Sequence, residues 1–134
     1  MPTFKRIDHV VVATEEMADA AAKWERNLGL RVEERLSRPR DASFDVARLP
    51  VGDAFIELLQ PVQEGRYAEQ LKERGEGLFS LSIEVDDLDE AVAHLRGKGA
   101  EVSEPQQGIW PGSRVARVSR ASAHGVSMQL IERR

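Results

Sequence analysis

The stretch Ile7-Asp8-His9-Val10-Val11-Val12-Ala13-Thr14 decides the fold, because it returns later in the chain in a related form. Its run of β-branched and apolar residues predicts a strand, and the segment 15–27 that follows predicts a helix. Thr14 is the expected N-cap of this helix and Gly29 is suited to end it. One face of the helix collects the apolar residues Met17, Ala20, Ala21, Trp24 and Leu28.

The same order of elements returns after a shift of 71 residues. The stretch Leu78-Phe79-Ser80-Leu81-Ser82-Ile83-Glu84-Val85 again predicts a strand, and Asp86 or Asp87 is expected to cap the next helix. Each half then continues with three more predicted strands. These are expected at residues 30–36, 43–49 and 54–59 in the first half, and at 100–103, 113–119 and 126–131 in the second. Each half therefore reads βαβββ.

A βαβββ module has only one helix, so it cannot cover both faces of its own sheet. We therefore expect an α+β fold in which two modules pair their sheets into a curved trough, as one domain over residues 1–134. The modules are predicted at 1–62 and 76–134, with a short helical linker at 63–75. We expect the polar residues of the first and last strands to gather in one cavity; the alternative is that they are four unrelated strand residues. They are His9, Glu57, Ser80 and Gln129.

Composition excludes several classes of protein. The chain has 134 residues and no cysteine, which rules out a disulfide scaffold, a thiolate zinc site and a cysteine nucleophile. Its net charge is −4, so it lacks the basic surplus of a nucleic-acid binder. No apolar run approaches the ~20 residues that a membrane span needs, and no signal peptide is recognisable. We therefore expect a cytoplasmic protein.

Three motifs resemble one known group of proteins. They are Ile7-Asp8-His9, the segment from Leu49-Pro50-Val51-Gly52-Asp53 to Gln60-Pro61, and Arg74-Gly75-Glu76-Gly77-Leu78 followed by Ile83-Glu84-Val85-Asp86-Asp87-Leu88. Together they resemble the vicinal oxygen chelate superfamily, which includes glyoxalase I, extradiol dioxygenases, bleomycin-resistance proteins and methylmalonyl-CoA epimerase. The epimerase branch is the most similar. The resemblance implies the glyoxalase-like fold and a homodimer.

The resemblance also implies a divalent metal, for which His9, Glu57 and Gln129 are the matching ligands. Two positions depart from the usual pattern, because Ser80 replaces a histidine and Gln129 replaces a glutamate. The site is therefore a degenerate one that binds a single Co, Ni, Mn or Zn ion, or none. An extradiol dioxygenase is excluded, since its iron needs two histidines and a carboxylate.

Epimerases of this branch use carboxylates as bases to remove a proton next to a thioester carbonyl. Gln129 cannot accept a proton, and the nearest match to the other base is Asp41. We therefore expect Glu57, Asp41 and His9 to be catalytic, in an isomerase or lyase acting α to a carbonyl of an acyl-CoA or similar small acid. The alternative is a metal-free small-molecule-binding, resistance or accessory protein that kept the cavity and lost the chemistry.

Overall fold

The structure is a computed structural model that describes residues 2–134. The chain divides into two compact units. The N-terminal unit is His9–Phe79, and the C-terminal unit consists of the residues up to Asp8 together with Ser80–Arg134. Among the described residues, no helix is both long enough and apolar enough to cross a membrane.

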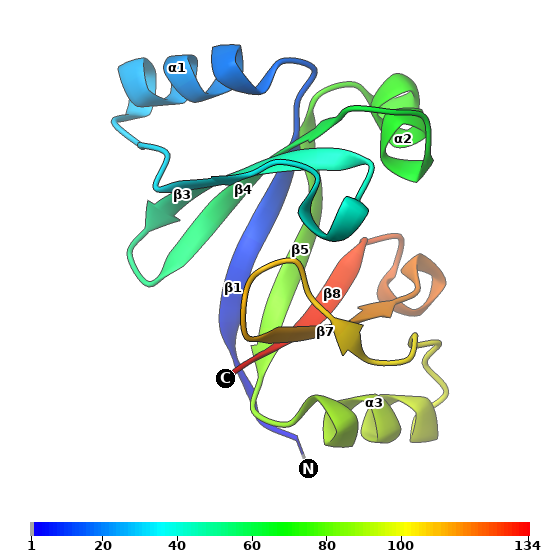
Figure 1. Cartoon of the computed structure of the whole chain (residues 1–134). Coiled ribbons are helices and arrows are strands. Elements are labelled where there is room, and N and C mark those ends of the chain that lie inside the picture. Colours follow the sequence, from blue (N-terminus) through cyan, green and yellow to red (C-terminus); the bar gives the residue numbers. More distant parts are fainter. Residues whose placement is uncertain (1) are drawn as a thin grey trace. The chain divides into compact units, whose positions relative to one another are not determined.

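The N-terminal unit contains a four-stranded sheet and two helices (Figure 1). The strand order is β2-β3-β4-β1, in which β1 and β4 are parallel and the other pairs are antiparallel. Its elements are β1 (Phe4–Ala13), which enters the unit at His9, α1 (Met17–Leu28), β2 (Glu34–Leu36), a 3-10 turn (Pro39–Asp41), β3 (Phe44–Val51), β4 (Ala54–Pro61) and α2 (Arg66–Arg74).

The helix α1 packs its apolar stripe onto one face of this sheet. Met17 and Ala21 of α1 are buried against Ala47, Leu49 and Leu58 of β3 and β4. The helix ends at Gly29 as predicted, because that glycine adopts the left-handed conformation with φ 75°.

The expected cap at Thr14 is wrong, and the N-cap is Glu16. The Thr14 hydroxyl instead donates a hydrogen bond to the carboxylate of Glu76 at 3.0 Å, and the N–H of Glu15 donates to the same carboxylate at 2.8 Å. These contacts hold the chain extended for two more residues before the helix begins.

The C-terminal unit repeats this arrangement. Its strand order includes β5-β8-β7-β6, in which β5 and β8 are parallel and the other pairs are antiparallel. Asp87 caps the helix by accepting a hydrogen bond from the N–H of Glu90 at 3.0 Å. The elements are β5 (Gly77–Val85), which enters the unit at Ser80, α3 (Leu88–Gly97), β6 (Gln106–Gln107), β7 (Ser113–Val118), a 3-10 turn (Arg120–Ala123) and β8 (Met128–Arg133).

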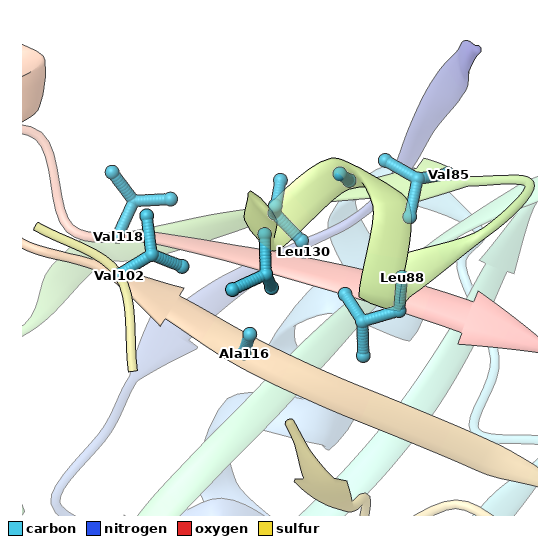
Figure 2. Packing of buried hydrophobic residues seen from close by; sticks show 8 residues of the cluster. Val85, Leu88, Val102, Ala116, Val118 and Leu130 are labelled. Carbon is cyan, nitrogen blue, oxygen red and sulfur yellow. The ribbon is translucent and has the colours of Figure 1, made fainter. Parts of the chain in front are cut away.

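The core of this unit lies between α3 and one face of its sheet. Figure 2 shows Leu88 of α3 together with Ala116 of β7 and Leu130 of β8, and all three side chains are fully buried. The equivalent layers of the two units confirm the α+β class and the internal repeat. How the two sheets meet stays a prediction, and so do the module boundaries.

One strand of the second half is not where it was predicted. Residues 100–103 form only an isolated bridge, between Val102 and Val118, and β6 is the two-residue segment Gln106–Gln107. Pro105 lies between the bridge and β6, and proline has no N–H to donate to a sheet. The pairing is therefore interrupted there.

Asp8 anchors the beginning of β1 within the C-terminal unit. Its side chain is fully buried and accepts two hydrogen bonds from Arg133 of β8, both at 2.8 Å. Arg6 donates to the same carboxylate at 3.1 Å and to Glu84 of β5 at 2.8 Å. The aspartate of the Ile7-Asp8-His9 motif is therefore a structural residue in a network of buried charges.

The last strand of each half also holds the first turn of the helix in that half. The side-chain oxygen of Gln60 in β4 accepts a hydrogen bond from the N–H of Met17 at 2.8 Å. In the C-terminal unit, Glu132 of β8 accepts from the N–H of Leu88 at 2.8 Å. Both contacts satisfy an N–H group that a helix leaves unpaired at its start. The repeat thus extends to individual hydrogen bonds.

The contact of Glu132 predicts an acid-sensitive contribution to stability. Burial alone raises the pKa of Glu132, but the hydrogen bond from Leu88 and the nearby Arg134 and Arg114 outweigh it and hold the pKa below its usual 4.5. The folded state therefore gains stability from this carboxylate above about pH 4.5 and loses it as the pH falls through the lowered value.

We expect Glu132→Ala to lower the free energy of unfolding by about 1.5–3 kcal/mol at pH 7, because it leaves the N–H of Leu88 without its acceptor. Glu132→Gln keeps an acceptor, as Gln60 does in the other unit. Because glutamine does not titrate, its free energy of unfolding should depend less on pH between about pH 5 and about pH 3. Urea unfolding across that pH range measures both effects. An unchanged pH dependence in Glu132→Gln would contradict this account.

Candidate functional site

The candidate site lies on the sheet face of the N-terminal unit that is turned away from α1. Side chains alternate between the two faces of a strand, so Leu58 faces α1 whereas Phe55 and Glu57 face the opposite way. His9 is the register partner of Phe55 in the parallel pair β1–β4, and Val11 is the partner of Glu57. His9 and Glu57 therefore share the sheet face opposite α1, and the common cavity that they were predicted to form with Ser80 and Gln129 stays a prediction.

His9 and Glu57 form a buried polar pair. The Nε2 atom of His9 lies 3.8 Å from Oε1 of Glu57, and the two side chains are only 2% and 6% exposed. At this separation the two groups interact as charges when the imidazole is protonated, but they do not form a short hydrogen bond. The imidazole ring stacks on Phe55 with ring centroids 4.4 Å apart and an angle of 14° between the planes. This stacking fixes the orientation of the ring beside the carboxylate.

Arg48 is a charged neighbour that the sequence analysis missed. It is the register partner of Glu57 on the antiparallel strand β3, so its side chain emerges on the same face. Its guanidinium carbon lies 4.3 Å from the centroid of the Phe55 ring, and its Nε lies 3.2 Å from a carboxylate oxygen of Glu33. The signal in the sequence was strand alternation, which separates Arg48 from the apolar neighbours Ala47 and Leu49.

Asp41 does not share the buried setting of the His9–Glu57 pair. It lies exposed at the end of the 3-10 turn that precedes β3, in a left-handed conformation with φ 59°. Arg38 and Arg40 in the same turn also have positive φ angles, so three non-glycine residues are held in a disfavoured conformation here. The role of Asp41 as a second base stays a prediction.

The C-terminal unit carries the other two predicted site residues. Gln129 of β8 is the register partner of Ser82 on β5, and its side-chain nitrogen donates a hydrogen bond to the Ser82 hydroxyl at 3.0 Å. Both residues lie on the face turned away from α3, because Leu130 and Ile83 face that helix. Ser80 precedes Ser82 by two residues and so shares this face. Ser82 was not predicted as a partner of Gln129.

The donor set was tested against a divalent metal. Among residues 2–134, no three or more His, Asp or Glu side chains are arranged to hold one ion. His9 and Glu57 are two strong donors, whereas Gln129 offers only a neutral amide oxygen. A tightly bound divalent ion needs three or four donors, usually imidazole or carboxylate. These residues do not fit a tight metal site.

The comparison with known proteins defines the class. Residues 8–128 match the Glyoxalase/Bleomycin resistance protein/Dioxygenase superfamily, and the chain belongs to this superfamily. This confirms the resemblance that the sequence motifs indicated.

Within the superfamily, the chain is similar to methylmalonyl-CoA epimerases. It is 32% identical to the human mitochondrial enzyme over 95 residues, which are 69% of this chain and 53% of that protein, so the match spans about half of the human enzyme. It is 31% identical to the ethylmalonyl-CoA/methylmalonyl-CoA epimerase of Cereibacter sphaeroides over 99 residues, 72% of this chain and 73% of that one.

A solved structure is similar to the chain over nearly its whole length. A methylmalonyl-CoA epimerase variant from Streptomyces coelicolor, in complex with 2-nitronate-propionyl-CoA, has a TM-score of 0.88 and 25% identity, covering 98% of this chain and 96% of that one.

Proposed function

We propose that the chain is an isomerase-type enzyme that removes a proton α to the carbonyl of an acyl-CoA. The observation that carries the proposal is the buried His9–Glu57 pair, on the sheet face opposite α1. The similarity to methylmalonyl-CoA epimerases supports an acyl-CoA carrying a carboxylate as the substrate. We also propose that the chain binds its substrate in the cytoplasm.

In this mechanism Glu57 is the base. The carbon–hydrogen bond α to the carbonyl breaks, its proton passes to a carboxylate oxygen of Glu57, and its electron pair moves into the carbonyl to give an enolate. Return of the proton from Glu57 to the same face regenerates the substrate, whereas delivery to the opposite face inverts the carbon.

His9 positions the carboxylate of Glu57. Its ring is held by Phe55, and its Nε2 stands 3.8 Å from Glu57. Inversion needs a proton donor on the other side of the enolate, and Asp41 is our candidate because it precedes β3 on an exposed turn that can approach a bound ligand. Without such a donor, the chain would exchange the α-proton with solvent and would not epimerise.

The predicted ligands His9, Glu57 and Gln129 offer too few strong donors for a tight metal site, so no step of the mechanism is assigned to a metal. Since Glu57 cannot serve fully as a ligand and as the base, we propose weak metal binding or none.

We also propose a homodimer, and sedimentation of the purified chain decides this. Exposed apolar side chains at the start of β1 support an association surface, since Phe4 and Ile7 are 47% and 56% exposed.

The proposal is tested by proton exchange in heavy water. We expect the purified chain to accelerate deuterium incorporation at the α-carbon of methylmalonyl-CoA about 100-fold or more over buffer, within the range that one positioned base supplies. Mass spectrometry follows the exchange, and chiral analysis of the product separates exchange from inversion.

The same preparation is analysed for bound metal and assayed again after treatment with a chelator. Exchange that survives the chelator supports Glu57 acting without a metal. Exchange no faster than in buffer, with both methylmalonyl-CoA and ethylmalonyl-CoA, would contradict the proposal and favour a binding protein.

A further inference from the structure

Three side chains form a layered assembly on the face of the N-terminal sheet that is turned away from α1. Phe55 of β4 lies between His9 of β1 and Arg48 of β3, at 4.4 Å from the imidazole centroid and 4.3 Å from the guanidinium carbon. The two neighbours come from strands on opposite sides of β4, so they occupy opposite faces of the ring. We call this assembly the Arg48 stack.

The stack runs from a buried end to an accessible one. The side chain of His9 is 2% exposed, whereas that of Arg48 is 29% exposed. Stacking on Phe55 uses the flat face of the guanidinium and leaves its N–H edge directed at an anion. The edge already contacts a carboxylate, since Nε of Arg48 lies 3.2 Å from Glu33. Glu33 is itself 56% exposed, so a ligand carboxylate can replace it at little cost.

Arg48 also stands beside the proposed base. Arg48 and Glu57 are directly opposite each other on antiparallel strands, which places their Cα atoms roughly 4.5–5.5 Å apart. A carboxylate bound to the guanidinium would therefore hold the adjoining carbon next to the Glu57 carboxylate. Removing a proton from that carbon adds a second negative charge to a substrate that already carries one. A fixed cation at the first charge lowers the barrier for this step.

We infer that Arg48 binds the free carboxylate of the substrate, and that it selects acyl thioesters with a carboxylate on the acidic carbon over simple acyl thioesters. This inference rests on the proposed function, because it assigns the substrate class of the same site. In the absence of substrate, the Glu33 carboxylate occupies the place of the substrate carboxylate.

The test compares two thioesters that differ only in that carboxylate, methylmalonyl-CoA and propionyl-CoA. We expect Arg48→Gln to lower kcat/KM for deuterium exchange into methylmalonyl-CoA about 30-fold or more, mainly through KM, because a charge-assisted bidentate contact is lost. Exchange into propionyl-CoA should stay within about threefold. Arg48→Lys should recover part of the loss. Glu33→Gln removes the competing carboxylate and should tighten methylmalonyl-CoA binding about two- to fivefold.

Arg31→Gln is the matched control, because Arg31 is 80% exposed and forms its ion pair with Glu25 of α1, at 3.5 Å. It should change neither substrate's kinetics, and thermal unfolding of all variants checks that they fold. Equal losses with both thioesters would overturn the inference and would show that Arg48 only positions His9 through Phe55. No loss with either thioester would overturn it as well.

Failure of the proposed function is distinguishable from failure of the inference. If the wild-type chain exchanges neither thioester, the function is wrong, and equilibrium binding by calorimetry then tests Arg48 alone. A preference of the wild type for methylmalonyl-CoA over propionyl-CoA that disappears in Arg48→Gln supports the carboxylate contact. The same preference in both proteins, or none in the wild type, overturns it.

Discussion

Replacing Glu57 by glutamine is expected to lower the rate of α-proton exchange about 1000-fold, since an amide cannot accept the proton and a positioned base contributes roughly 10²–10⁴-fold. The substitution keeps the size of a side chain that is only 6% exposed, so the fold should persist. The kcat for deuterium incorporation into methylmalonyl-CoA is the quantity to measure, with KM expected to change little.

Two further variants serve as comparisons for Glu57→Gln. Glu57→Asp keeps the carboxylate but shortens its reach, and we expect a smaller loss of about 10- to 100-fold. Glu25→Gln removes an exposed carboxylate from α1 and should leave the rate unchanged. If Glu57→Gln exchanges protons as fast as the wild type while remaining folded, Glu57 is not the base. A binding role for the pair would then be favoured.

Removing the buried carboxylate of Asp8 is expected to cause the largest loss of stability. Asp8→Asn removes the negative charge that pairs with Arg133 and can keep at most one of the two 2.8 Å contacts, in a position where the Asp8 side chain is fully buried. Breaking one partner of a buried ion pair costs about 3–5 kcal/mol, and the partial exposure of Arg133 favours the lower end. The midpoint of thermal unfolding should fall by roughly 10 °C.

The measurement is urea or thermal unfolding, with a double variant as its internal control. Asp8→Ala combined with Arg133→Met removes both charges and should recover part of the loss, because no unpaired charge is left behind. Glu25→Ala breaks an exposed pair with Arg31 and should cost about 0.5 kcal/mol or less. A loss below about 1 kcal/mol in Asp8→Asn would show that this network contributes little to stability.

The order of elements could be predicted from the sequence because its signals are local. The apolar periodicity of α1, the glycine at its end and the strand-like runs at His9 and Ser80 all act within a few residues. The β6 strand was misplaced because Pro105 removes one donor in a short segment with weak strand character. Thr14 was misassigned as a cap because its partner Glu76 lies 62 positions away in the sequence.

The candidate site was predictable only in part, for the same reason. Pairing His9 with Glu57 followed from the repeat, which predicts where the first and last strands of a half lie. Arg48 required the register between β3 and β4, and Ser82 required that between β5 and β8. A register depends on contacts across the sheet, which periodicity along one strand does not reveal.

The separation of each sheet into two faces has a consequence for how this chain can change over evolutionary time. β4 uses Leu58 and Gln60 to hold α1, and β8 uses Leu130 and Glu132 to hold α3, while Glu57 and Gln129 project on the other side. Substitutions at positions 57 and 129 therefore leave the helix-supporting residues in place. The same scaffold can therefore carry different side chains at these two positions and acquire new chemistry without first acquiring new stability.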